Sequence, residues 1–303
     1  MTQATAHPLP DILCIGSVLW DVIGRSHLAL RLGHDMPGRI TRLPGGVAMN
    51  IAVTLARHGL APAILTAIGR DPEGDELIAA CNQLRLITDY VYRSDDLPTD
   101  RYLAIEGANG LIAAIADAHS LEAAGDKILR PLADGRLGTE DRPWAGPIAL
   151  DGNLTKALLA EIATSALFAK ADLRIAPASP GKAGRLLPIL PLPNATIYLN
   201  LEEAGILCQT GFASAPAAAE GLLARGARRV LVTDGGQPSA DGAAGAGVIS
   251  AAPRPVLITR ITGAGDTFMA AHLVAERRGL DRAASLGAAL DAAAKYVSGD
   301  IQS

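Results

Sequence analysis

Aromatic residues and clustered positive charge are both scarce in this 303-residue chain. Phe, Trp and Tyr together make up 3% of the residues, which leaves little material for a surface on which bases could stack. Lys plus Arg number 27 against 31 Asp plus Glu, a formal net charge of −4, and no basic cluster stands out. These shortages argue against a nucleic-acid partner.

Cysteines and long apolar runs are also few. The three cysteines, Cys14, Cys81 and Cys208, are far apart and show neither metal-ligand nor C-x-x-C spacing, so we expect core thiols in a reducing compartment. No apolar run approaches the roughly 20 residues of a membrane span, and no basic segment followed by an apolar run opens the chain. We therefore expect a soluble, cytoplasmic protein with no signal peptide and no membrane partner.

Several common ligand-binding motifs are missing as well. The chain has no G-x-x-x-x-G-K-[ST], which excludes a Walker-type phosphate loop. Residues 15–18 (Ile-Gly-Ser-Val) lack the G-x-G-x-x-G that a dinucleotide site requires after a first strand. There is no G-x-S-x-G elbow, and the histidines form no H-E-x-x-H pair. Phosphate chemistry in this chain would need another kind of anion site.

Residues 261–268, Ile-Thr-Gly-Ala-Gly-Asp-Thr-Phe, offer such a site. This turn of small residues precedes a helical pattern over 266–278, so backbone N–H groups at the helix start are unpaired and the helix dipole favours anions. Asp266 stands in the turn, where a carboxylate can accept a proton from a hydroxyl while the amides hold a phosphate. Alternatively, Asp266 only complements the dipole, and on these eight residues the two interpretations weigh equally.

Short apolar runs alternate with helical patterns along most of the chain. We expect buried strands at residues 11–16, 61–68, 147–150, 173–176, 195–199 and 229–233. Helices are expected over 44–59, 74–86, from about 153 to 169, after 180, after 200, over 266–278 and over 281–298. Repeated βα units predict an α/β fold with a doubly wound, mainly parallel sheet flanked by helices and ligands at its carboxyl edge.

Two segments interrupt this alternation. Residues 101–106 and 111–116, joined by a polar turn, predict a β-hairpin without an intervening helix, and residues 24–43 show an irregular pattern. We predict a body over residues 11–298 with a small β-sheet lid, formed by 24–43 and 100–117, inserted within it. Such a lid could cover a substrate, mediate a dimer contact or be a structural extension.

Three polar features fall near the expected carboxyl edge. Asp21 follows the first strand, the Gly45-Gly46 pair lets a backbone approach a ligand closely, and Asn50 offers both a donor and an acceptor. Their alternatives are a solvated loop aspartate and an ordinary helix-entry turn.

Five motifs occur in a fixed order in this chain. They are Gly16 with Asp21, Gly45 to Asn50 (Gly-Gly-Val-Ala-Met-Asn), Asn200 to Glu203 (Asn-Leu-Glu-Glu), Thr233 to Gly236 (Thr-Asp-Gly-Gly) and Gly263 to Asp266 (Gly-Ala-Gly-Asp). Together they resemble the PfkB (ribokinase-like) family of carbohydrate and nucleoside kinases, over about residues 11–298. The resemblance implies a ribokinase-like fold with a β-sheet lid and an ATP- and Mg²⁺-dependent phosphotransferase.

The resemblance also implies residue roles. Asp266 would be the base, and Gly263, Ala264 and Gly265 would form the anion hole for the γ-phosphoryl group. The residues implied to hold sugar hydroxyls are Asp21, Gly45, Gly46 and Asn50. Those implied to serve the nucleotide are Asn200, Glu203, Thr233 and Gly235, with Glu203 reaching Mg²⁺ through water. The lid of the family closes over the sugar and often mediates dimers, so a homodimer through the lid is expected.

Within the family, the chain is similar to pseudouridine kinases. The similar segments are Gly45 to Ala52 with Leu55 to Arg57, the lid phrase Tyr102 to Asp117, Leu150 to Leu154 and Pro177 to Ala183. By analogy Tyr102 and Asp117 are candidates near the substrate, although lid packing and a hairpin cap are equally good explanations. The phosphate acceptor would then be the 5′-hydroxyl of pseudouridine.

Three departures from the family pattern bear on these expectations. Val47 stands where ribokinases typically carry lysine, which argues against ribokinase proper, and Met49 stands where pseudouridine kinases often have arginine. Arg260 replaces an aspartate that helps many members bind a monovalent cation, which makes such a cation doubtful here. The alternatives to pseudouridine are another nucleoside (adenosine, inosine, uridine), a free sugar (ribose, fructose) or a non-catalytic binding protein. The intact Asp266 argues against the last.

Overall fold

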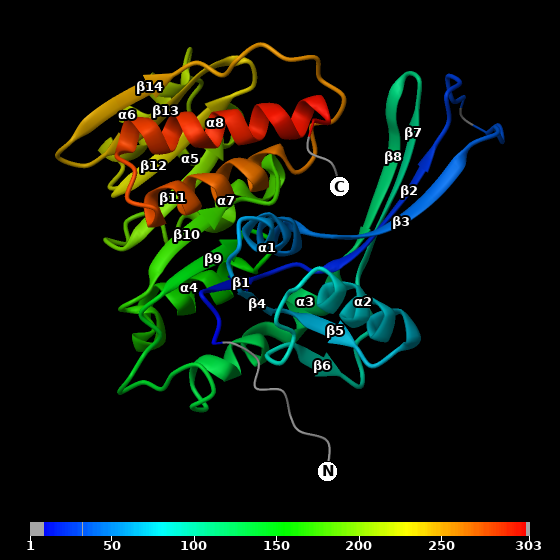
Figure 1. The fold of residues 1–303 in the computed structure, drawn as a ribbon, viewed down its shortest axis with the longest axis horizontal. Coiled ribbons are helices and arrows are strands. Elements are labelled where there is room, and N and C mark those ends of the chain that lie inside the picture. Colours follow the sequence, from blue (N-terminus) through cyan, green and yellow to red (C-terminus); the bar gives the residue numbers. More distant parts are fainter. Residues whose placement is uncertain (1–8, 32, 301–303) are drawn as a thin grey trace.

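The apolar runs form the strands of one large sheet in a computed structural model that describes residues 9–31 and 33–300 (Figure 1). Its eight strands are β1 (Ile12–Ile15), β4 (Pro62–Leu65), β9 (Pro147–Asp151), β10 (Asp172–Ala176), β11 (Ala195–Asn200), β12 (Arg229–Asp234), β13 (Gln237–Ala243) and β14 (Gly247–Ala251). Their order is β14-β13-β12-β11-β10-β9-β1-β4, parallel from β12 to β4, with β13 and β14 added as antiparallel strands. The predicted doubly wound, mainly parallel sheet is confirmed.

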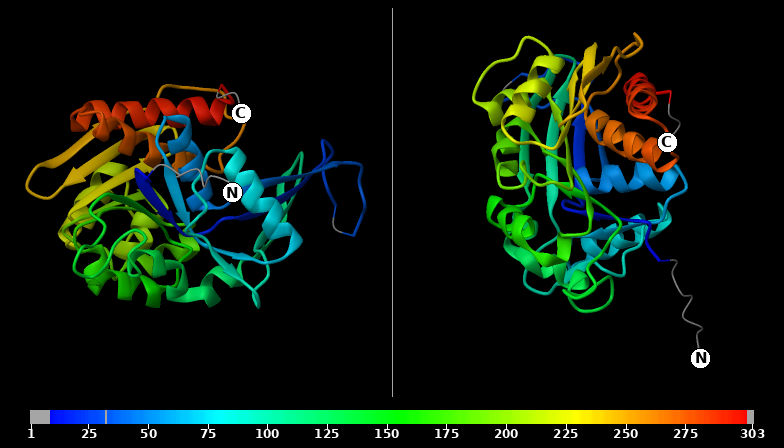
Figure 2. Two further views of the ribbon diagram at one scale, coloured as in Figure 1. Left: turned by 60° about the horizontal axis from the view of Figure 1, so that its bottom comes forward. Right: turned by 90° about the vertical axis from the view of Figure 1, so that its left-hand side faces the viewer.

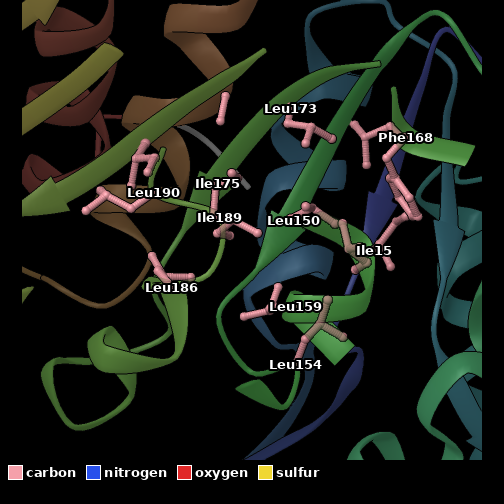
Figure 3. Packing of buried hydrophobic residues seen from close by; sticks show 14 of the residues in the cluster. Ile15, Leu150, Leu154, Leu159, Phe168, Leu173, Ile175, Leu186, Ile189 and Leu190 are labelled. Atoms are coloured by element: carbon pink, nitrogen blue, oxygen red, sulfur yellow. The ribbon is translucent and has the colours of Figure 1, made fainter. Parts of the chain in front are cut away.

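Side chains of the central strands are buried on both faces of this sheet, as parallel sheets require. In β1, Leu13 and Ile15 enter one apolar cluster, while Ile12 and Cys14 enter the other. Figure 3 shows part of the first cluster, where Ile15 and Leu150 of neighbouring strands lie close to one another. A continuous apolar run rather than an alternating one is therefore what marks these strands in the sequence.

Two helical layers cover the sheet (Figure 2). The layer on one face consists of α1 (Val47–Arg57), α2 (Pro72–Gln83), α7 (Ala264–Arg277) and α8 (Arg282–Ser298). The layer on the other face consists of α3 (His119–Ala124), η1 (Gly125–Leu132), α4 (Lys156–Thr164), η2 (Ala166–Phe168), η3 (Pro180–Leu186), α5 (Leu201–Cys208) and α6 (Ala215–Ala224). The three cysteines are buried free thiols, as expected.

A four-stranded sheet projects from the body (Figure 1). It consists of β2 (Leu19–Arg25), β3 (Arg39–Gly45), β7 (Arg101–Gly107) and β8 (Gly110–Asp117), in the order β3-β2-β7-β8. We call it the lid. Its first segment extends beyond residues 24–43 because only residues 16–18 separate β1 from β2, so the chain passes directly from the main sheet into the lid.

Another expected segment differs in the structure, and one apolar run forms no strand. The strand expected at 61–68 is divided, because β5 (Ala67–Gly69) leaves the main sheet to pair with β6 (Tyr92–Ser94). The apolar run at 256–258, Val-Leu-Ile, has no regular secondary structure, and Leu257 is 82% exposed. The hairpin of β13 and β14 already forms that side of the main sheet, so this run has no strand partner and crosses the surface instead.

Helix α7, which carries Asp266, is anchored to the sheet from its far end. The carboxylate of Glu276 accepts hydrogen bonds from Arg174 of β10 and Arg229 of β12. Since a helix moves as a rigid element, these bonds also fix its first turn. Among the described residues, no helix is long and apolar enough to cross a membrane.

Candidate active site

The Gly263 turn presents free backbone donors at the start of α7. Gly263 is the N-cap residue with φ 87°, a left-handed conformation that favours glycine. The Ala264 amide donates to the Ile261 carbonyl at 3.0 Å, whereas the amides of Gly265 and Asp266 have no hydrogen bond within the described part of the chain. Of the three residues predicted to form an anion hole, Ala264 thus has its amide engaged, whereas the amides of Gly263 and Gly265 are open donors among the described residues, and the amide of Asp266 joins them.

Asp266 is held by a side chain from a distant part of the sequence. The Asn50 amide nitrogen donates to Oδ2 of Asp266 at 2.8 Å, which joins α1 to α7. Asn50 lies in the first turn of α1, one position after Met49, whose side chain is buried and lies 3.9 Å, sulfur to sulfur, from Cys81. Asn50 therefore faces the site while Met49 fills the core.

The surroundings of Asp266 bring the pKa of its carboxyl group close to neutral pH. Burial raises its pKa to about 7, the hydrogen bond from Asn50 lowers it, and the charges of Asp151 and Glu203 raise it further. A carboxyl group with such a pKa can accept a proton from a hydroxyl and release it again. The interaction with Glu203 also indicates that the N-x-x-E segment lies close to Asp266.

Asp21 and Tyr102 lie on one face of the lid. They are direct partners in the β2–β7 pairing, so both side chains point to the same side of the sheet. Burial raises the pKa of Asp21 to about 6, and burial followed by the charge of Asp21 raises the pKa of Tyr102. Gly45 packs against Asp21 so closely that a Cβ atom there would lie 2.0 Å from Oδ2 of Asp21. The Asp21 carboxylate thus depends on a glycine at position 45.

Gly46, the second glycine of the pair, packs closely against Ser17, which lies where the chain passes from the main sheet into the lid. A Cβ atom on Gly46, the N-cap of α1, would lie 2.4 Å from the Ser17 carbonyl oxygen. The Ser17 hydroxyl accepts from the Val47 amide at 3.1 Å and donates to Oδ2 of Asp151 at 2.7 Å. Asp151 is 1% exposed and ends strand β9, so it anchors this corner of the site.

Asn153 and Lys182 extend the same hydrogen-bond network. The Asn153 amide nitrogen donates to the Ser17 hydroxyl at 3.0 Å, and Lys182 Nζ donates to Oδ1 of Asn153 at 2.6 Å. The predicted site residues do not include Ser17, Asp151, Asn153 or Lys182. The sequence signal for this part of the site is the Asp-Gly-Asn tripeptide at the end of a buried strand, because ligands of such sheets bind at the carboxyl edge.

A cavity of about 640 Å³ lies beside the predicted nucleotide residues. Asn200, Thr233 and Gly235 all line it, together with Phe212 of the segment between α5 and α6. Its volume falls within the range of small-molecule sites. The structure thus brings these three predicted residues together at the ends of β11 and β12.

Glu203 caps helix α5, in addition to its predicted contact with Mg²⁺ through water. Oε2 of Glu203 accepts from the Asn200 amide at 2.8 Å, and Oδ1 of Asn200 accepts from the Glu203 amide at 2.8 Å, a reciprocal cap of α5. Burial raises the pKa of Glu203 to about 7, the Asn200 bond lowers it, and the charge of Glu202 raises it. A cation nearby would favour the ionised carboxylate, so the group fits the predicted indirect contact with Mg²⁺.

Two predicted features lie apart from this cluster. Asp117 pairs with Arg101 across β7 and β8, and the register places it on the lid face opposite to Asp21 and Tyr102. Arg260 Nε donates to the Tyr296 carbonyl at 2.7 Å, and its guanidinium lies 4.0 Å from the centre of the Tyr296 ring. The structure therefore does not bring Asp117 to the site, and it fixes a permanent cation beside the anion-hole turn.

The described residues contain no group of three or more His, Cys, Asp or Glu side chains arranged to hold a metal ion. Mg²⁺ in phosphoryl-transfer sites usually keeps several waters and binds through one or two carboxylates and the phosphates of the substrate. A single carboxylate such as that of Glu203 is compatible with that mode of binding.

The fold and the site have three features that suit a phosphotransferase for small molecules: polar side chains on one face of the lid, a carboxylate beside open amides at a helix start, and a cavity beside the N-x-x-E segment. Residues 9–299 match the family described as pfkB family carbohydrate kinase, and the chain belongs to that family. The predicted family and the predicted enzyme class are thereby confirmed, and membership implies the use of ATP.

Solved structures share the fold over nearly the whole chain. A carbohydrate kinase from Agrobacterium tumefaciens superposes with a TM-score of 0.79 at 23% identity, covering 97% of this chain and 94% of that one. A ribokinase from Arabidopsis thaliana, complexed with ribose and ATP, gives a TM-score of 0.73 at 19% identity, covering 95% and 92%. These similarities establish the ribokinase-like fold.

A curated relative is similar over a shorter stretch. Pseudouridine kinase of Escherichia coli (strain K12) is 36% identical over 107 residues, 35% of this chain and 34% of that protein. Pseudouridine kinase of Arabidopsis thaliana is 27% identical over 100 residues, 33% of this chain and 26% of that protein. Each match therefore spans about a third of this chain, and about a third or a quarter of the relative.

Proposed function

We propose that this chain transfers the γ-phosphoryl group of ATP to a hydroxyl of a ribosyl compound, and that the acceptor is the 5′-hydroxyl of pseudouridine. The observation that carries the chemistry is the Asn50–Asp266 bond at the start of α7, next to the open amides of the glycine turn. The similarity to two pseudouridine kinases supports the choice of acceptor. Met49 stands where pseudouridine kinases often have arginine. Because its side chain is buried, this difference is a change in the core, and pseudouridine remains possible as the acceptor.

Each group has a task in the proposed reaction. Asp266 takes the proton of the acceptor hydroxyl as its oxygen forms a bond to the γ-phosphorus, and ADP leaves. The amides of Gly265 and Asp266 stabilise the charge on the transferring group. Asp21 and Tyr102 hold the acceptor from the lid, and Asn200, Thr233 and Gly235 lie along the nucleotide. Mg²⁺, when bound through Glu203 and water, would neutralise phosphate charge.

The lid can also provide a dimer contact. Four large apolar side chains, all on the face opposite to Asp21, are 39% to 76% exposed: Ile40, Leu103, Ile105 and Ile115. A patch of this kind is suited to covering by a second copy of the chain. Arg260 supports the expectation that no monovalent cation is needed, because its guanidinium occupies the α8 end beside the anion-hole turn.

A substrate panel tests the proposed acceptor. ADP release would be measured with ATP and Mg²⁺ against pseudouridine, uridine, adenosine, inosine, ribose and fructose. We expect kcat/KM for pseudouridine to exceed that for uridine by about 10-fold or more, since a site that pairs with the extra N–H of pseudouridine leaves its own polar group unpaired with uridine. Preference for another compound would support the kinase activity but contradict pseudouridine as the acceptor. No ADP release with any compound would favour a different acceptor or a non-catalytic binding role.

The pH dependence of kcat tests the base. The rate requires ionised Asp266, so kcat should fall as pH drops through the pKa of about 7 and level off above it. The hydrogen bond from Asn50 favours the carboxylate, so Asn50→Ala should move this acidic limb to higher pH. The profile would be recorded at saturating substrates to separate proton transfer from binding. If the acidic limb lies at the same pH in Asn50→Ala as in the wild type, the hydrogen bond from Asn50 does not lower the pKa of Asp266.

A further inference from the structure

The C-terminal end of α8 holds the segment that leads from β14 into the glycine turn (Figure 1). The Thr259 amide donates to the Val297 carbonyl at 2.8 Å, and Nε of Arg260 donates to the Tyr296 carbonyl at 2.7 Å. Carbonyl groups in the last turn of a helix have no partner within it, so these two bonds act as a cap of α8. They fix the segment beside α8, but they do not reach the turn itself.

The hydroxyl group of Tyr296 makes a bond of a different kind. It donates to the Thr262 carbonyl at 2.8 Å, and a Cβ atom on Gly263 would lie 2.5 Å from the same hydroxyl oxygen. The tyrosine ring therefore packs directly against the turn, at a residue whose left-handed conformation favours glycine. This bond does not cap α8, because the carbonyl that accepts it belongs to the turn.

The neighbouring carbonyl groups of the turn find their partners locally. The Ile261 carbonyl accepts from the Ala264 amide at 3.0 Å. The Gly263 carbonyl accepts from the amide of Thr267 at 3.0 Å and from its hydroxyl at 2.9 Å. Such bonds belong to the ordinary start of a helix. The Thr262 carbonyl depends instead on a side chain 34 residues further along the chain.

The Thr262 carbonyl and the Gly263 amide belong to the same peptide group. Resonance couples the two, so a hydrogen bond accepted by the oxygen draws electron density from the nitrogen and makes the N–H a stronger donor. That N–H has no hydrogen bond among the described residues and is one of the open donors of the predicted anion hole. The Tyr296 hydroxyl is thus able to strengthen this donor without contacting a phosphoryl group itself.

Arg260 adds a positive charge at the face of the same ring. Its guanidinium carbon lies 4.0 Å from the centre of the Tyr296 ring, and the bond from Nε to the Tyr296 carbonyl keeps it there. A cation over an aromatic ring draws electron density from it, which makes the hydroxyl a stronger donor. Burial raises the pKa of Tyr296, the charge of Arg260 lowers it and the charge of Asp266 raises it, with a net shift upward. The phenol therefore stays protonated near neutral pH and can donate.

We propose that Tyr296 is a positioning residue of the anion site: its hydroxyl holds and polarises the Thr262–Gly263 peptide, and the N–H of that peptide binds the transferring phosphoryl group. Arg260 strengthens the effect from the face of the ring. The inference rests on the proposed phosphoryl transfer and adds a donor to the two amides already assigned to it. Because charge on the transferring group is stabilised most in the transition state, a stronger donor acts on kcat more than on nucleotide affinity.

NMR of the Gly263 amide tests the polarisation without any turnover. Isotope labelling of the threonine carbonyl carbon and the glycine nitrogen selects two amides, because Thr210–Gly211 and Thr262–Gly263 are the only Thr–Gly pairs in the chain. In Tyr296→Phe we expect the Gly263 nitrogen signal to move upfield while the Gly211 signal stays in place. Arg260→Gln should move the Gly263 signal in the same direction, by less. A Gly263 signal that stays in place in Tyr296→Phe would overturn the proposal, whichever acceptor the kinase uses.

Steady-state kinetics tests the contribution to transfer. With an acceptor that supports turnover, Tyr296→Phe should lower kcat by about 10-fold, less than the roughly 10²- to 10³-fold that loss of a whole oxyanion donor costs. The KM for ATP should change little, and thermal melting identifies a folding defect. Tyr92→Phe is the matched control, since Tyr92 of β6 also has a cation over its ring, Lys127 at 5.5 Å, and its kcat should equal that of the wild type.

Two outcomes separate this inference from the proposed function. An unchanged kcat in Tyr296→Phe, together with lost turnover in Asp266→Asn, would contradict the role of Tyr296 and support the proposed function. Retained turnover in Asp266→Asn would contradict the proposed function, whereas the Gly263 signal would still report on the hydrogen bond from Tyr296.

A double-mutant cycle tests whether Arg260 acts through Tyr296. Arg260→Gln alone should lower kcat by about 2- to 5-fold, as expected for a cation–π contact at an exposed position. In the Tyr296→Phe background the same substitution should have no further effect, because the hydroxyl on which it acts is gone. Equal effects in both backgrounds would contradict the part assigned to Arg260. Arg254→Gln, in the same exposed segment, is the control and should leave kcat unchanged.

Discussion

Replacing Asp266 by Asn is expected to lower kcat by about 10² to 10⁴-fold, the range that a positioned acid or base contributes. The amide has nearly the same shape and can still contact Asn50, so the turn and its open amides should persist. Nucleotide affinity, measured by calorimetry, should therefore change little. If the variant binds ATP normally but has lost turnover, the defect lies in proton transfer by Asp266 and not in the folding of the turn.

Asp75→Asn provides the matched control. Asp75 is also an acidic residue in the first turn of a helix, α2, and its carboxylate is paired with Arg93 at the surface. If Asp266 only complemented a helix dipole, both substitutions would act on stability by a few tenths of a kcal/mol, up to about 1 kcal/mol, and neither would affect kcat. Retained turnover in Asp266→Asn would remove the base from the proposed mechanism.

Gly45→Ala is expected to raise KM for the acceptor by roughly 10- to 100-fold. The new Cβ atom would lie 2.0 Å from Oδ2 and 2.3 Å from Cγ of Asp21, so the carboxylate has to rotate away. Hydrogen bonds to a charged group contribute about 1.5–3 kcal/mol, and each 1.4 kcal/mol corresponds to about tenfold in affinity. Steady-state kinetics with varied acceptor would measure the effect.

Gly24→Ala is the corresponding control on the lid. Gly24 lies in β2, the strand of Asp21, and a Cβ atom there has its nearest contact at 3.9 Å, an ordinary van der Waals distance. Its KM should match the wild type, and the KM for ATP should be unaffected in both variants. If Gly45→Ala has the KM of the wild type for the acceptor, the proposed contact between Asp21 and the acceptor is contradicted.

The six parallel strands of the main sheet were predictable because they are largely buried on both faces. A continuous apolar run such as residues 12–15 then carries its own secondary-structure information. The first lid strand gave no such pattern. In β2 only Leu19 and Trp20 are buried, and the strand gains its partners from β3 and from β7, about 80 residues further along the chain. Pairing between distant segments, rather than local preference, forms it.

Site residues were predictable where a local turn carries the chemistry. The glycine turn before Asp266 combines a required left-handed residue, open amides and an acid within four positions. Asp117 shows the limit of this approach. Because successive residues of a strand point to opposite faces, a resemblance in the lid sequence could not distinguish the face of Tyr102 from the face of Arg101, and the register places Asp117 with Arg101.

The sequence by itself determined the class of fold, the family and the glycine turn before Asp266, because periodicity, glycine positions and helix starts are local properties. Only the tertiary structure decided which side chains meet. It joins Asn50 to Asp266 across 216 residues and turns Met49 into the core. These encounters depend on how helices far apart in the chain pack against one sheet, and no short stretch of sequence encodes that packing.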